Sequence, residues 1–93
     1  MRLTLLPGDD IAVLVRAARD DVESLVVVIV PGFDPLALAQ AKAAIGPLAV
    51  ELAPACRLNA IIAAENAAPD AVDSAIAFLE QARSTTGQLL DLA

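Results

Sequence analysis

Leu25-Val26-Val27-Val28-Ile29-Val30 is an unbroken apolar run of mostly β-branched residues. A strand with one solvated face alternates apolar and polar residues. An unbroken run is instead typical of a central parallel strand that is covered on both faces. Pro31-Gly32 follows the run and marks its end. This segment therefore predicts the middle of a parallel sheet, which the flanking sequence has to pair and cover.

The flanking sequence alternates between strand and helix patterns. Strands are predicted at residues 2–6, 57–62 and 87–92, and helices at about residues 10–20, 35–53 and 70–83. Strands that alternate with helices favour a parallel sheet with crossover helices. We therefore expect a single α/β domain, residues 1–93, with about four mostly parallel strands and three helices.

The predicted helix at residues 35–53 has little polar surface. Asp34 can cap it, and Pro35 suits its first turn, where the missing N–H would have no helical partner. Pro47 lies inside the helix, removes a backbone hydrogen bond and crowds the preceding turn, so we expect a kink or a break. A helix with so few polar positions is normally buried on several sides. Its main polar residues are Gln40, Lys42 and Glu51.

Composition narrows the class of protein. Of the 93 residues, 58% are apolar and 2% are aromatic, and the net charge is −6. The apolar excess indicates surface shared with another chain. The absence of a basic cluster argues against binding to nucleic acid or to an anionic membrane surface. The chain has no histidine, a single cysteine (Cys56) without metal-ligand spacing, and no apolar run of the ~20 residues that span a bilayer. We expect a cytoplasmic protein without a bound metal.

Four short pieces occur in order along the C-terminal part of the chain. They are Arg57-Leu58-Asn59-Ala60-Ile61, Pro69-Asp70-Ala71-Val72, Ala75-Ile76-Ala77-Phe78-Leu79 and Thr86-Gly87-Gln88-Leu89-Leu90. In that order they resemble the C-terminal third of a short-chain dehydrogenase/reductase (SDR). Laid over that family, the chain begins near the family's fourth strand. The resemblance implies a truncated protein that corresponds to the C-terminal half of a Rossmann-like doubly wound fold.

The resemblance also implies where the family's catalytic residues would fall. The family uses a tyrosine as acid/base, a lysine that lowers the pKa of that tyrosine, and a serine that orients the substrate carbonyl. The serine position falls on Pro31 or Gly32. The tyrosine and lysine positions fall on Asp34 and Leu38 in one alignment and on Leu38 and Lys42 in another, and the sequence leaves both open. Neither supplies a tyrosine, because the chain contains none. Lys42 is either a relic of the catalytic lysine or a solvated helix residue.

A nicotinamide cofactor is not expected. Enzymes that bind such a cofactor hold its pyrophosphate on a glycine-rich first turn. Here Gly8, Gly32, Gly46 and Gly87 lie far apart, and no G-x-G-x-x-G motif occurs.

Together these observations favour a non-catalytic, SDR-like subunit that assembles with a full-length reductase chain or with itself. In the family, the tyrosine/lysine helix forms one assembly contact, and the last helix and strand form another. Loss of the first half would leave the strand at residues 2–6 as an open edge and one face of Val26–Val30 uncovered. The predicted partner-interface residues are Leu36, Leu38, Ile45, Leu48, Leu52, Ile76, Leu79 and Leu89.

Two other classes stay open. A small α/β regulatory module resembling anti-sigma-factor antagonists fits the length and the valine-rich strand, although the Asp-Ser-Gly phosphorylation stretch expected there is missing. An oxidoreductase whose active site is completed by a partner chain is the least favoured class, because the chain has no Tyr and no His.

Overall fold

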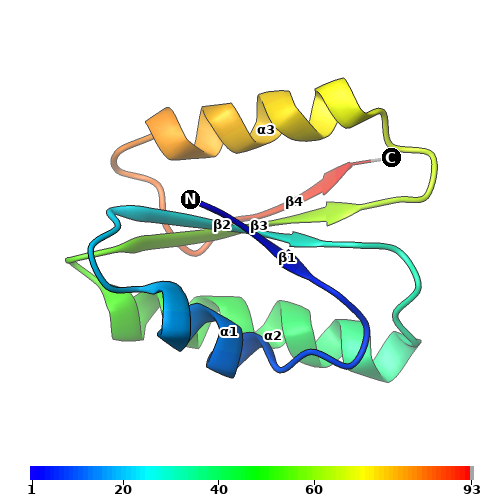
Figure 1. Ribbon diagram of the computed structural model, residues 1–93, viewed down its shortest axis with the longest axis horizontal. Coiled ribbons are helices and arrows are strands. Elements are labelled where there is room, and N and C mark those ends of the chain that lie inside the picture. Colours follow the sequence, from blue (N-terminus) through cyan, green and yellow to red (C-terminus); the bar gives the residue numbers. More distant parts are fainter. Residues whose placement is uncertain (93) are drawn as a thin grey trace.

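The computed structural model describes residues 1–92 and shows one sheet with helices on both sides (Figure 1). The elements are β1 (Arg2–Leu5), α1 (Ile11–Ala18), β2 (Ser24–Ile29), α2 (Pro35–Leu52), β3 (Arg57–Ala63), α3 (Pro69–Gln81) and β4 (Leu89–Leu92). This arrangement confirms the predicted α/β class, with four parallel strands and three helices in a Rossmann-like order.

The sheet has the strand order β1-β2-β3-β4, and all its neighbouring strands are parallel. β2 pairs with β1 on one side and β3 on the other, with Val27 opposite both Leu3 and Ala60. All residues of β2 are buried, as predicted for a central strand. β1 has a single neighbour and is an edge strand, as expected.

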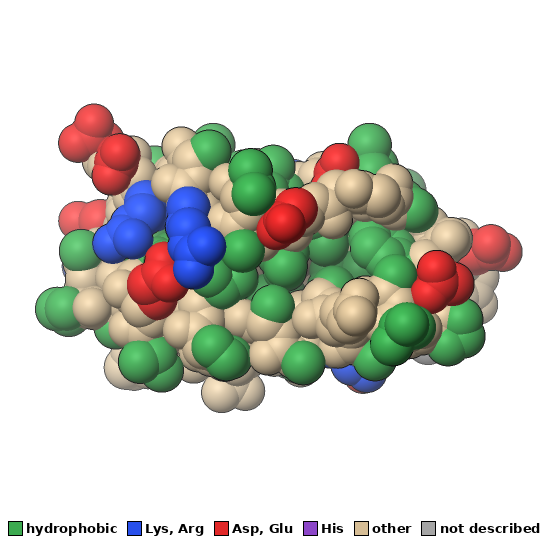
Figure 2. Space-filling model, turned by 90° about the horizontal axis from the view of Figure 1, so that it is seen from below, with side chains coloured by type: hydrophobic (Ala, Val, Ile, Leu, Met, Phe, Trp, Pro, Cys, Tyr) green, Lys and Arg blue, Asp and Glu red, His purple; other side chains and the backbone are tan. Residues whose placement is uncertain are grey.

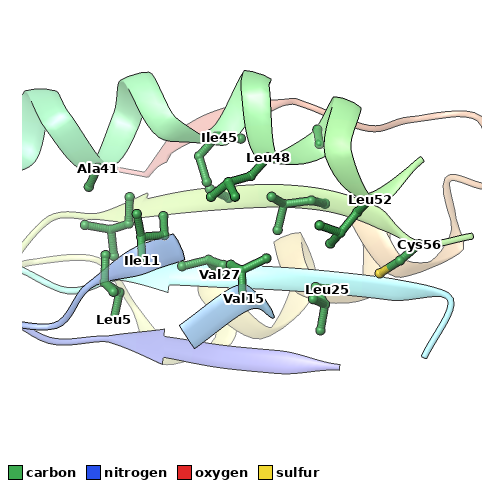
Figure 3. Close-up of a cluster of buried hydrophobic side chains, with 14 residues drawn as sticks. Leu5, Ile11, Val15, Leu25, Val27, Ala41, Ile45, Leu48, Leu52 and Cys56 are labelled. Carbon is green, nitrogen blue, oxygen red and sulfur yellow. The ribbon is translucent and has the colours of Figure 1, made fainter. Parts of the chain in front are cut away.

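The side chains of β2 alternate between two apolar layers. Val27 packs with α1 and α2 on one face, and the labelled side chains of these elements point toward one another in Figure 3. Val26 and Val28 pack with α3 on the other face. The expectation that one face of Val26–Val30 lacks a cover is therefore wrong, because α3 covers it.

The side of the sheet on which α3 lies follows from an unusual connection. The crossovers through α1 and α2 are right-handed, as in about 98% of such units. The strands follow one another in a single direction across the sheet, yet α3 lies on the face opposite α1 and α2 (Figure 1). The β3–α3–β4 crossover is therefore left-handed. This connection is what covers both faces of β2 and β3.

α2 runs without a break through Pro47, so the predicted break does not occur. Pro47 and Ala43, whose carbonyl loses its helical partner, are both solvent-exposed, so water can bond that carbonyl. Gly46 precedes the proline and has no Cβ to clash with the ring. None of the helices in residues 1–92 is long and apolar enough to cross a bilayer.

α1 is short and is held to α2 by an ion pair. Asp10 caps α1 by accepting hydrogen bonds from the Ala12 and Val13 amides at 2.9 and 3.2 Å. Arg16 donates from Nε and from its second terminal nitrogen to the two Glu51 oxygens at 2.9 and 2.8 Å. These bonds hold the pKa of the Glu51 carboxyl below its ordinary value. The pair links the two helices at the surface, and the apolar contacts that both make with the core hold them over the sheet.

Candidate functional site

The carboxyl ends of β2, β3 and β4 surround a hollow of about 250 Å³. Ligands of open parallel sheets bind at this edge, just beyond the strand ends. The hollow is lined by Val30, Pro31, Gly32 and Leu38 on one side and by β3 and β4 residues, including Asp91, on the other. It is the place in this fold where an active site would be looked for.

Three of the positions that the resemblance assigns to catalysis meet in this hollow. Pro31 and Gly32 stand for the serine, and Leu38 is shared by the two alignments of the tyrosine and lysine. Asp34 and Lys42 are not part of the lining. Asp34 caps α2 instead, and its carboxylate accepts a hydrogen bond from the Ala37 amide at 2.8 Å. Asp34 therefore has a structural role at the start of the helix.

Lys42 lies on α2, outside the hollow. It is half-buried, and no residue within 1–92 forms an ion pair or hydrogen bond with its ammonium. The lysine of the family's mechanism acts by lying beside the reacting phenol. In this position Lys42 has no acid or base of that kind next to it.

Asp91 is the one lining residue of the hollow that carries an ionisable side chain. The sequence did not single it out, because it is the lone polar residue of a four-residue strand. The rest of the lining is aliphatic, apart from Phe33 and backbone. The hollow can therefore hold an apolar group beside one carboxylate.

Residues of β3 that belong to the family-like pieces form hydrogen bonds with the segment that precedes β4. Asn59 is fully buried, donates from Nδ2 to the Thr85 carbonyl at 3.1 Å and accepts from the Gln88 amide at 3.0 Å. Thr86 Oγ1 accepts from the Leu58 amide at 3.0 Å. These bonds make Asn59 a hydrogen-bonded strand residue, and they join Thr86 to Leu58, which is 28 residues away in the sequence.

Gly87 and Arg57 also help to attach β4 and α3 to β3. Gly87 has a φ of 77°, a left-handed conformation that disfavours other residues. Arg57 donates to the carbonyls of Glu80 and Arg83 at 3.0 and 3.3 Å, which satisfies the C-terminal end of α3. The pieces that carry the resemblance therefore position β4 and α3.

The predicted partner-interface residues divide into two groups. Those in the first group are buried in the core of the single chain: Ile45, Leu48, Leu52, Ile76 and Leu79. In the second group, Leu36 is 68% exposed and Leu89 36% exposed, whereas Leu38 lines the hollow. The sequence did not predict the exposure of Val50, at 77%, or of Phe78, at 62%. An apolar helix position can face the chain's own sheet or solvent, and periodicity does not distinguish the two.

The solvent side of α2 carries no charge along most of its length. We call this surface the α2 outer face; its exposed residues are Leu36, Ala39, Gln40, Ala43, Gly46, Pro47 and Val50. Small side chains along its middle would let another helix approach closely. Such a surface is unusual for a solvated helix, which normally has a polar side.

Charge is distributed unevenly between the two ends of the strands. The loops and first helical turns at the carboxyl edge contain no Lys or Arg within residues 6–10, 30–34, 64–70 and 91–92. The acidic residues there are Asp9, Asp10, Asp34, Glu65, Asp70 and Asp91. Figure 2 shows acidic side chains at both ends of the molecule, whereas most of the basic ones in this view are gathered at the left. The carboxyl edge is therefore uniformly acidic.

Cys56 is buried near the amino ends of the strands, away from the hollow. Burial raises the pKa of its thiol, and Sγ lies 3.5 Å from the Arg57 carbonyl oxygen. The thiol is therefore held in its protonated form, as expected for a packed rather than a reactive cysteine.

Comparison with known proteins bears on the family. Neither the curated proteins nor the solved structures gave a match to this chain. A family model described as a short chain dehydrogenase-like protein, SDR-like, matches residues 8–92. This match spans all three helices, the pieces that hold β4 in place and the hollow at the carboxyl edge. The chain belongs to the SDR-like family of short-chain dehydrogenase-like proteins.

Proposed function

We propose that this chain is a non-catalytic SDR-like subunit that assembles with a full-length short-chain dehydrogenase/reductase, or with itself, and stabilises or tunes the assembly. In this proposal it corresponds to the C-terminal half of the doubly wound fold. The observation that carries it is the hollow at the carboxyl edge. Pro31, Gly32 and Leu38 line it, and the resemblance assigns these residues to positions of the catalytic side chains.

The chemistry of the family cannot run on these groups. Reduction of a carbonyl needs an acid that delivers a proton to the carbonyl oxygen, and the family uses a phenol whose pKa is lowered by a lysine. Leu38 has no proton to give, and the backbone at Pro31 and Gly32 offers no hydroxyl. Asp91 alone has no base, lysine or second acid among the lining residues.

The acidic side chains at the carboxyl edge also argue against the binding of a nicotinamide cofactor there. The pyrophosphate of such a cofactor is anionic and is normally bound where backbone amides or basic side chains attract it. The carboxyl edge of this sheet has carboxylates from Asp9 to Asp91 and no Lys or Arg in the loops named above. Like charges there would repel the pyrophosphate.

Assembly is supported by the α2 outer face. Val50 and Leu36 near its two ends are among the most exposed large apolar residues of the chain. α2 is 18 residues long, which is about 27 Å of helix at ~1.5 Å per residue. From Leu36 to Val50 the exposed positions of α2 carry no charge, and a long uncharged surface of this kind favours helix-to-helix contact between chains. Phe78 on α3 and Leu89 on β4 are further exposed apolar residues, and they lie on opposite faces of the sheet.

The first test is cofactor binding by the purified chain. We expect no change in NADH or NADPH fluorescence and no heat in calorimetry up to about 1 mM cofactor, a limit that corresponds to about −4 kcal/mol of binding free energy. A full-length short-chain dehydrogenase is the positive control. Micromolar binding by this chain alone would contradict the proposal and favour an oxidoreductase whose site is completed by a partner.

The second test is assembly through the α2 outer face. In sedimentation velocity at low micromolar concentration, the wild-type chain, alone or mixed with its reductase partner, is expected to sediment as an oligomer. Ala43→Glu places a charge in the middle of the face and should weaken association by at least about tenfold, since an unpaired charge at an interface costs several kcal/mol. Ala43 is exposed in the single chain, so the variant should still fold.

Ala17→Glu, at an exposed position of α1 that belongs to neither proposed contact, is the matched control and should leave the sedimentation coefficient unchanged. A wild-type chain that is a folded monomer, both alone and with a reductase partner, would rule out the assembly role.

A further inference from the structure

We propose that the carboxyl edge of the sheet is a docking groove for a basic, apolar segment of another protein. Beside the 250 Å³ hollow lies a second one of about 360 Å³, between the start of α1 and the first turns of α2. Phe33 lines both hollows, so they are neighbours across this side chain. We call the two hollows together the edge groove, and its lining extends from Gly8 to Asp91.

The floor of the edge groove is apolar. Ile11 and Ala41 lie in the second hollow, and Leu38 and Ile62 in the first. Phe33 is only partly buried against the core below it. Figure 2 shows apolar side chains inside the recess between the two helices of this face. A partner must therefore bring at least one aliphatic or aromatic side chain to fill it.

The rim of the groove is acidic, which specifies the charge of that partner. Asp9 and Asp10 belong to the second hollow and Asp91 to the first, with Glu65 in the loop next to Ala64. Asp9 accepts a hydrogen bond from the Leu6 amide through Oδ2 only, so its other oxygen is outside that bond. No basic side chain in the loops of this edge neutralises these groups.

The spacing of the carboxylates points to a protein segment as the occupant. No three acidic residues within residues 1–92 lie close enough together to hold a metal ion. Charges that are spread along a groove with an apolar floor match lysine and arginine side chains spaced along a peptide, with an apolar residue between them. The net charge of −6 adds long-range attraction for such a segment.

This inference goes beyond the proposed assembly and does not depend on it. The groove lies at the strand ends, whereas assembly uses the α2 outer face, and Gln40 is the one residue that borders both. Failure of peptide binding would leave the sedimentation result unchanged, and loss of assembly would leave the groove intact.

The test uses the hexapeptide KRLWRK as the probe. The chain has no tryptophan, so the fluorescence of the peptide reports binding without interference. We expect saturable binding that weakens by at least about tenfold when NaCl is raised from about 20 to about 300 mM, because screening shortens the range of the attraction. EDLWDE should not bind, and KRGWRK, which lacks the leucine, should bind several times more weakly.

Variants of the chain locate the contact. Glu65→Gln with Asp91→Asn removes two rim charges whose carboxylates make no hydrogen bond within residues 1–92, and should weaken binding by about five- to tenfold. Asp20→Asn with Asp21→Asn removes the same charge at the opposite end of the sheet. Asn tolerates the positive φ of 64° at position 21.

The control pair should change the affinity by less than about twofold. An equal loss of peptide affinity in the two double variants would show that the peptide is attracted only by the net charge of the chain. That result would overturn the proposed docking groove. Absence of KRLWRK binding at about 0.5 mM would overturn it as well, since that limit excludes even a weak specific complex.

Discussion

Ile45→Ala is expected to lower the free energy of unfolding by about 2–5 kcal/mol, measured by urea titration. Ile45 is fully buried and packs with Val27 and Ala60 in the layer under α2. Figure 3 shows it pointing into that layer beside Leu48. Truncation removes a well-packed side chain and leaves a cavity. Small domains have only about 5–15 kcal/mol of stability, so much of it would be lost.

Val13→Ala is the matched control, because it also replaces a β-branched helix residue by alanine and lies on α1, outside the α2 outer face. Val13 is 65% exposed, so this variant should change the free energy of unfolding by less than about 0.5 kcal/mol. The two variants raise helix propensity to a similar degree, which isolates burial as the cause of the difference. If Ile45→Ala altered oligomer dissociation without altering unfolding of the chain, Ile45 would belong to an interface rather than to the core.

Asn59→Ala is expected to destabilise the chain by about 2–4 kcal/mol. The substitution leaves the Thr85 carbonyl and the Gln88 amide, which form part-buried bonds, without the partner that the fully buried Asn59 side chain supplies. Buried polar groups that lose a partner carry the full cost of desolvation. Because these groups precede β4, the effect should be largest there, seen as faster hydrogen exchange of the Gln88 and Leu89 amides.

Asn66→Ala provides the comparison for Asn59. Asn66 is exposed in the loop after β3, and its side chain makes no hydrogen bond within residues 1–92. We expect a change within about 0.5 kcal/mol and unaltered exchange in β4. Similar destabilisation by the two asparagine variants would show that the Asn59 network does not hold β4 in place.

Much of the fold could be predicted from local sequence. The unbroken run at Leu25–Val30 indicated a central parallel strand, and β2 is buried along its whole length. Asp34 and Pro35 marked the start of α2, which begins at Pro35. These features depend on neighbours in sequence, through capping bonds and apolar periodicity, and for that reason they can be read without the tertiary structure.

The candidate site could be predicted only in part. Pro31, Gly32 and Leu38 were assigned to catalytic positions by resemblance, and the structure brings these three together in one hollow. Asp91 was not singled out, because nothing near it in sequence marks it. Asp91 reaches the hollow because β4 pairs with β3 and ends beside the hollow.

The sequence by itself determined which residues form strands and helices and which of their positions are apolar. Only the tertiary structure decided what those apolar positions face. Ile45 and Ile76 pack on the chain's own sheet, whereas Val50 and Phe78 face solvent. The side of the sheet that α3 covers was likewise set by the left-handed crossover. The hydrophobic effect has no direction, so an apolar stripe specifies that a surface must be covered but not by which surface.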